Sequence, residues 1–167
     1  ADLPVPPAFL IDTAAYRLFV SANGLDVVIE RLGRPGLEPV AVEEASRQLR
    51  AAFAAAPVPN TLRAAIEELV QKVGDRPLAV RSSATAEDLP QASFAGQQDT
   101  FLNVRGREAL LEAVRGCWSS LWTARAMAYR QRQGILPGDV VIVRRQPRAE
   151  RHHRASGRIA PIHIASL

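Results

Sequence analysis

The sequence predicts an α+β fold: a mostly helical first half, followed by short strands and a long helix pair. Apolar residues recur at helical spacing through residues 1–74. The segments LAVRSS and DTFLNV then have the β-branched, alternating character of strands, and they flank a polar loop rich in small residues. Helical periodicity returns from Glu108. The chain has 167 residues, 47% of them hydrophobic, and so can bury one sizeable core, as one compact domain or a piece of one.

Capping and turn-forming residues divide the first half into four helices. A short polar residue before an apolar periodic run begins a helix, and Gly or Pro ends it. The predicted helices are one begun by Asp12 or Thr13, one over residues 25–32 ended by Gly33, one over residues 40–56 ended by Pro57, and one begun by Asn60 or Thr61 and ended by Gly74.

The second half is predicted as strand, loop, strand and then helix. The strands are LAVRSS and DTFLNV, and a further buried strand is expected at DVVIV, residues 139–143. Between DTFLNV and DVVIV, apolar residues at helical spacing form one stripe, which extends toward Met127 and Tyr129. Gly134 ends this helical region. The stripe consists of Leu110, Leu111, Val114, Cys117, Trp118, Leu121 and Trp122.

Positive charge is concentrated in residues 144–167. Six of the 21 basic side chains lie there against one acidic side chain, so residues 1–143 carry 15 basic and 16 acidic groups. The net charge of +4 is therefore no indication that the body of the chain binds nucleic acid. A basic arm that binds nucleic acid is the alternative, and strongly salt-dependent binding would support it.

The composition favours a cytoplasmic protein without a membrane partner. No run approaches the roughly 20 apolar residues that cross a bilayer, and ADLPVPPAFL lacks the features of a secretory signal. The single cysteine, Cys117, can form no internal disulfide and is expected to be a core thiol.

The segment VRSSATAED, residues 80–88, carries groups that suit a polyphosphate. Arg81 offers a planar fork of five donors at the end of a strand, and Ser82 and Ser83 add hydroxyl groups. Farther along, Gly96 would let the backbone approach a ligand closely, and Thr100 adds another hydroxyl. These residues predict an anion site.

An ordinary surface loop is the alternative interpretation of the same segment. Arg81 would then pair with Glu87 or Asp88, and the serines would cap local turns. Spacing alone does not distinguish the two, because no motif here is as specific as a P-loop.

Two long segments carry a resemblance to known proteins: LPVPPAFLIDTAAYRLFV and VRSSATAEDLPQASFAGQQDTFLNVRGREALLEAVRGCWSSLWTARAMAYRQRQG. In the same order along the chain, they resemble the N-terminal nucleotide-binding region of the phosphoenolpyruvate synthase, rifampicin phosphotransferase and pyruvate phosphate dikinase family. The resemblance covers about residues 2–143.

The resemblance implies an ATP-grasp-like fold over residues 1–143, with ATP and Mg²⁺ as cofactors. It assigns ATP contacts to Arg81, Gly96 and Thr100. Second-line loop residues would be Ser82, Ser83 and the pair Gln97–Gln98. In the family, this region activates ATP so that a histidine on another domain receives a phosphoryl group, which passes to pyruvate or to rifampicin. The sequence does not distinguish the two acceptors, although FAGQQDT leans slightly toward the antibiotic.

Several family elements have no counterpart in this sequence. The phosphate-binding lysine loop is expected before the first residue, and the magnesium ligands and the TSH-type histidine are expected beyond residue 167. A separately encoded remainder of the enzyme is the expected protein partner. Lys72 is expected to be a solvated charge at a helix C-terminus. His152, His153 and His163 have neither catalytic nor ligand spacing, so neither catalytic residues nor metal ligands are predicted here.

Three hypotheses follow for the whole chain. The first is an ATP-binding fragment of a dikinase-type phosphotransferase, inactive on its own. The second is a non-catalytic binding or interaction module. The third is a gene remnant, in which residues 144–167 are a divergent tail read out of frame and the stripe from Leu110 to Trp122 is exposed for want of a partner.

Overall fold

The computed structural model describes residues 8–82, 99–137 and 162–166, which contain both helices and strands. In chain order the elements are β1 (Ala8–Ile11), α1 (Thr13–Ala22), α2 (Leu25–Leu32), α3 (Pro39–Ala55), α4 (Asn60–Val73), β2 (Leu78–Ser82), β3 (Thr100–Val104), α5 (Gly106–Ser120), α6 (Ala124–Arg132) and β4 (Ile162–Ser166).

These elements confirm the predicted combination of a mostly helical first half with short strands and a later helix pair. The Asp12 carboxylate accepts hydrogen bonds from the backbone N–H groups of Ala14 and Ala15, which fixes the start of α1. At the other end of the helical half, Gly74 has a φ of 69° and ends α4. The late helical region is broken after Ser120 and restarts where the Thr123 hydroxyl accepts from the Ala126 N–H. The expected strand DVVIV lies outside the described residues.

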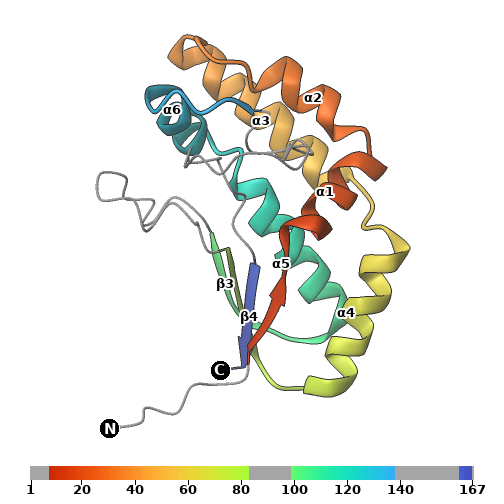
Figure 1. Cartoon of the computed structure of the whole chain (residues 1–167). Helices are drawn as coiled ribbons and strands as arrows, with labels where there is room; N and C mark the ends of the chain where they lie inside the picture. Colours follow the sequence, from red (N-terminus) through yellow and green to blue (C-terminus); the bar gives the residue numbers. More distant parts are fainter. Residues whose placement is uncertain (1–7, 83–98, 138–161, 167) are drawn as a thin grey trace, which may run out of the picture.

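The four strands form one antiparallel sheet in the order β1-β4-β2-β3. Figure 1 shows β4, the last strand in the sequence, between β1 and β2. This strand was not predicted, because it lies within the segment expected to be a divergent tail. On the other side of β2, the register to β3 shifts between Leu78 and Val80. Asn103, on the β3 side of this irregularity, has a φ of 57°, in the left-handed region that G1-type β-bulges use.

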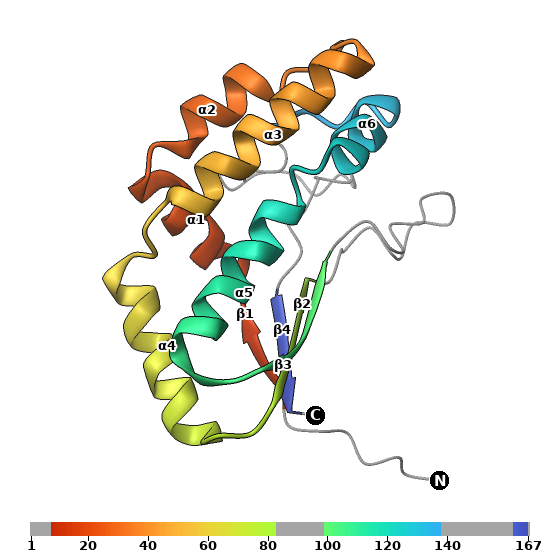
Figure 2. The same cartoon turned by 180° about the vertical axis from the view of Figure 1, so that it is seen from behind.

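One face of the sheet is covered by helices. Burial alternates along β2, where Leu78, Val80 and Ser82 are buried and the residues between them are more exposed. On β4, Ile162 and Ile164 are buried directly opposite Ser82 and Val80. α5 contacts both β2 and β3, and Figures 1 and 2 show the helices gathered on this one side. The side chains that alternate with these buried ones therefore lie on the opposite face of the sheet, called the outer face below.

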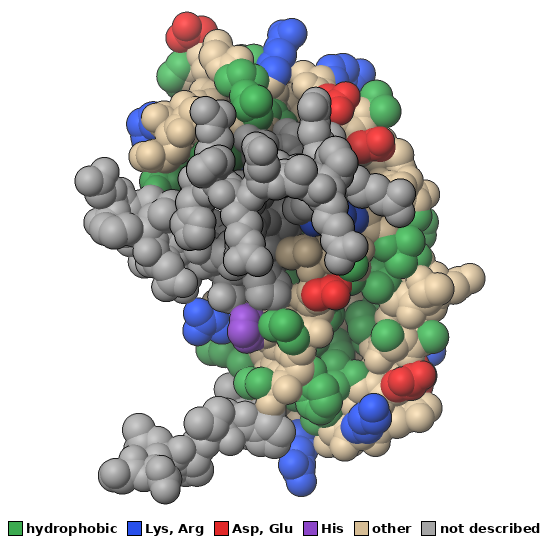
Figure 3. Space-filling view, viewed as in Figure 1, with side chains coloured by type: hydrophobic (Ala, Val, Ile, Leu, Met, Phe, Trp, Pro, Cys, Tyr) green, Lys and Arg blue, Asp and Glu red, His purple; other side chains and the backbone are tan. Residues whose placement is uncertain are grey.

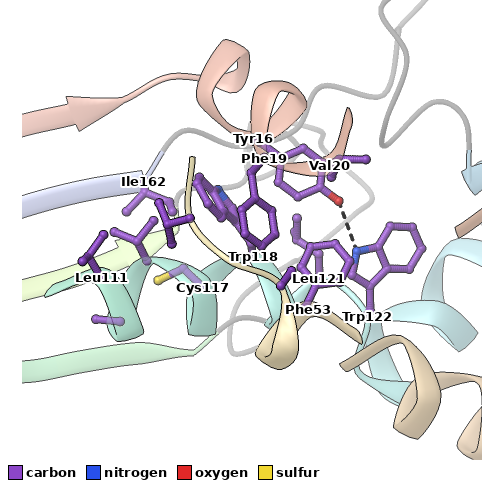
Figure 4. Close-up of a cluster of buried hydrophobic side chains, with 14 of the residues drawn as sticks. Tyr16, Phe19, Val20, Phe53, Leu111, Cys117, Trp118, Leu121, Trp122 and Ile162 are labelled. Carbon is purple, nitrogen blue, oxygen red and sulfur yellow. Dashed lines mark hydrogen bonds between the residues drawn. The ribbon is translucent and has the colours of Figure 1, made fainter. Parts of the chain in front are cut away.

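Aromatic side chains from four segments form the centre of the helical layer. The ring centroid of Trp118 lies 4.8 Å from that of Phe19 and 5.9 Å from that of Tyr16. The ring centroid of Phe53 on α3 lies 6.3 Å from that of Trp122. Figure 4 shows these rings converging around the end of α5.

The apolar stripe of residues 110–122 is buried by the chain's own helices and sheet. Its exposed fractions run from 0% at Leu110 and Val114 to 7% at Leu121. The expectation that this stripe is exposed for want of a partner is therefore wrong. α1, α3 and α4 supply the cover that was assigned to a missing lobe. Among the described residues, no helix has the length and hydropathy of a membrane span.

Candidate functional site

Arg81 lies on the outer face of the sheet with Thr100 beside it. Arg81 is exposed, and its register partner on β3 is Thr100, which is exposed as well. Residues directly opposite in an antiparallel pair have Cβ atoms about 4.5–5.5 Å apart. Two of the residues expected to contact ATP, 19 positions apart in the sequence, are thus neighbours on one open surface.

Ser82 projects to the opposite face from Arg81. Its side chain is 9% exposed, and its hydroxyl has no hydrogen-bond partner in the described part of the chain. Successive residues of a strand point to opposite faces, so Arg81 and Ser82 do not act on a ligand from the same side. Ser83, Gly96 and the pair Gln97–Gln98 lie outside the described residues.

Cys117 of α5 contacts the ends of both strands that flank residues 83–98. Its thiol donates a 3.9 Å hydrogen bond to the Asp99 carbonyl and also receives a backbone hydrogen bond from Ser82. Burial, and then the charge of Asp99, raise the pKa of Cys117 to about 12, although the bond from Ser82 opposes this. The prediction of a core thiol is confirmed. The thiol joins the ends of β2 and β3 to the helical layer.

A close contact between α5 and β3 also fixes the position of Thr100. A Cβ added at Gly116 would lie 2.4 Å from Cζ of Phe101. Glycine at this position lets the Phe101 ring lie directly against the helix. The neighbouring residue, Thr100, is therefore held on the outer face by the packing of Phe101 on the inner face.

His163, which the sequence analysis set aside, is the neighbour of Arg81 on the other side. It lies on β4, where its register partners are Arg81 on one side and Leu10 on the other. In Figure 3 a histidine side chain lies beside a basic side chain, with hydrophobic side chains next to them. The alternation in IHIAS was the available signal, but the surrounding arginine-rich sequence obscured it.

A cavity in the described part of the structure lies at the edge of the sheet, where Leu10 belongs to its lining. It has a volume of about 370 Å³ and lies between β1, α4 and α5, with an apolar lining that includes Phe9, Ile66 and Trp118. Lys72 lies at this cavity, exposed in the last turn of α4 as predicted. Arg81 and Thr100 do not line it. Within the described ranges, no three His, Cys, Asp or Glu residues gather as metal ligands would.

A family described as "Pyruvate phosphate dikinase, AMP/ATP-binding domain" has a model that matches residues 1–145. The chain belongs to this family. The match confirms the resemblance drawn from the two quoted segments. It includes Arg81 and Thr100, whereas β4 and His163 lie beyond the matched residues.

The similar proteins include phosphoenolpyruvate synthases and rifampicin phosphotransferases. A phosphoenolpyruvate synthase of Aeropyrum pernix is 45% identical over 144 residues, which are 81% of this chain and 18% of the relative. A probable phosphoenolpyruvate synthase of Methanocaldococcus jannaschii is 47% identical over 143 residues, or 81% of this chain and 12% of the relative. A rifampicin phosphotransferase of Streptomyces sviceus is 46% identical over 134 residues, which are 78% of this chain and 15% of the relative. The chain spans less than a fifth of the length of these relatives.

Proposed function

We propose that the chain is the ATP-binding part of a dikinase-type phosphotransferase, with Arg81 holding phosphate oxygens of ATP. The observation that carries the proposal is the pairing of Arg81 with Thr100 on an exposed sheet face, within the segment that matches an AMP/ATP-binding family. We propose an ATP-grasp fold for the complete domain, because the described antiparallel sheet with helices on one face fits one half of such a site.

The chemistry of these side chains suits a triphosphate. The Arg81 guanidinium donates charge-assisted hydrogen bonds in a planar fork, and the Thr100 hydroxyl adds one neutral donor. We propose that Gly96 and Ser83 contribute from the intervening segment. Ser82 instead faces the core, so its proposed part is to hold the end of β2 through its backbone bond to Cys117. The described groups position the phosphates and neutralise charge, which is the main contribution of protein to phosphoryl transfer.

The remaining parts of the reaction are assigned to a remainder outside this chain. Mg²⁺, when bound, would neutralise phosphate charge, and we propose that its ligands lie on that remainder. The acceptor histidine would lie there too, and pyruvate or rifampicin would be the final acceptor. Because ATP is the substrate and the one cysteine is a buried thiol, the cytoplasm is the proposed site of action.

Calorimetric titration with ATP and Mg²⁺ tests this function. We expect Arg81→Ala to weaken binding at least about tenfold, because hydrogen bonds to charged groups contribute roughly 1.5–3 kcal/mol. Arg34→Ala is the matched control: Arg34 is exposed in the connection between α2 and α3, at the end of the helical layer distant from the sheet. Equal affinity of wild type and Arg81→Ala would disprove the phosphate role.

A non-catalytic interaction module is the second candidate. This function is favoured if neither the wild-type chain nor Arg81→Ala binds ATP and the wild-type chain still unfolds cooperatively. The gene-remnant hypothesis loses its main physical support, since the stripe it expected to be exposed is buried. The out-of-frame origin of residues 144–167 stays a prediction that sequencing the locus decides.

A further inference from the structure

We propose that His163 is a phosphate-binding side chain on the same face as Arg81 and Thr100. The three residues form one row across β4, β2 and β3. This inference rests on the proposed function and extends it, because position 163 lies outside the residues matched to the family.

The register places the imidazole next to Arg81. His163 and Arg81 are directly opposite in the antiparallel pair of β4 and β2, as Arg81 and Thr100 are in the pair of β2 and β3. Ile162 and Ile164 on either side of His163 are 1% and 0% exposed on the helical face. Because strand residues alternate, the His163 side chain must project from the outer face, where Arg81 projects.

The row has the dimensions and donors for a polyphosphate. Neighbouring strands are about 4.8 Å apart, so the three side chains span roughly 10 Å along the hydrogen-bonding direction. They offer an imidazole N–H, a guanidinium fork and a hydroxyl group, all of which donate to phosphate oxygens. Leu10 follows His163 on β1 with 59% of its surface exposed, so the row has an apolar flank on that side.

The pairing of Arg81 with His163 is itself informative. The positively charged Arg81 lies directly opposite a side chain that brings no negative charge. Within the described ranges, neither Arg81 nor His163 forms an ion pair with a carboxylate. An oxyanion bound between the two side chains would pair with the Arg81 guanidinium and accept a hydrogen bond from the imidazole N–H.

Titration with inorganic tripolyphosphate isolates this contribution from that of the nucleoside. The full chain is compared with His163→Ala, His163→Gln and Arg81→Ala by calorimetry. We expect His163→Ala to weaken binding about threefold to tenfold, as the loss of one hydrogen bond predicts. In the ring-proton NMR spectrum, the signal absent from His163→Gln should move on addition of tripolyphosphate.

The controls separate this inference from the proposed function and from nonspecific binding. If Arg81→Ala loses binding while both His163 variants bind like wild type, the inference fails and the proposed function stands. If neither residue matters, both fail. The double variant Arg148→Gln/Arg151→Gln tests attraction by the arginine-rich segment, and the His163 signal must still move in it. A His163 signal that does not move in wild type overturns the inference even if one variant fails to fold.

Discussion

The indole N–H of Trp122 donates a 3.1 Å hydrogen bond to the hydroxyl of Tyr16. Tyr16 is completely buried and Trp122 is 1% exposed, so water does not compete for this bond. It joins α1 to the turn between α5 and α6, as the dashed line in Figure 4 shows. Burial raises the pKa of the Tyr16 hydroxyl, and the Trp122 bond and the charge of Arg130 oppose that shift.

Replacing this hydroxyl should destabilise the helical layer. Tyr16→Phe leaves the buried indole N–H without its acceptor, and we expect a loss of about 1–3 kcal/mol in the free energy of unfolding. Urea denaturation measures the loss. In a double-mutant cycle with Trp122→Phe, the coupling between the two positions should be clearly above zero. Independent, additive effects would show that the bond contributes nothing.

Cys117 should make stability fall at alkaline pH. A thiol in the unfolded chain has its ordinary pKa of 9.0, whereas in the folded chain burial raises the pKa of Cys117 to about 12. Below pH 9 both states keep the proton, and above it the unfolded state loses the proton first. The free energy of unfolding should therefore decrease above pH 9, approaching about 1.4 kcal/mol per pH unit. Urea titrations at pH 8 to 10 should show a smaller decrease for Cys117→Ala.

Gly116→Ala should weaken the packing of β3 on α5. The added methyl would lie 2.4 Å from Cζ of Phe101, so the ring must move. We expect a loss of about 1–3 kcal/mol, the usual cost of overpacking. The double variant Gly116→Ala/Phe101→Leu should recover part of the loss, since the smaller side chain makes room. A thermal midpoint as low in the double variant as in Gly116→Ala would contradict this explanation.

Arg130→Met should be neutral or stabilising by up to about 2 kcal/mol. Arg130 is 8% exposed, its guanidinium carbon lies 4.8 Å from the Trp122 ring centroid, and its Nη2 has no partner in the described part of the structure. Burial lowers its pKa to about 10. Methionine retains contact with the ring and removes the buried charge. Exposed Arg132 provides the matched control, Arg132→Met. A loss above 2 kcal/mol would point to an anionic partner for Arg130.

Local signals predicted the helices closely, because capping and stop residues act within a few positions. Asp12 begins α1, Gly33 follows α2 and Gly74 follows α4, as the sequence indicated. The same period-two rule that identified LAVRS as a strand also separates Arg81 from Ser82. The assignment of Ser82 as a loop residue beside Arg81 obscured that difference.

The sheet order and the third member of the outer row depend on long-range pairing. Arg81 and His163 are 82 positions apart in the sequence, and no spacing rule connects them. Five residues of strand within an arginine-rich segment give a weak pattern, and only their hydrogen bonds to two other strands define their place. The cover over the apolar stripe was likewise a matter of packing between helices that sequence alone does not specify.

The position of β4 has a consequence for the order of events during synthesis. As the chain leaves the ribosome, α1 to α5 can form and pack on contacts already present. Among the described strands, the edge strand β1 pairs with β4 alone, and these hydrogen bonds cannot form until residue 166 has been made. A translation stop before residue 162 would therefore leave β1 and β2 with exposed edges, and such nascent chains would be prone to aggregate.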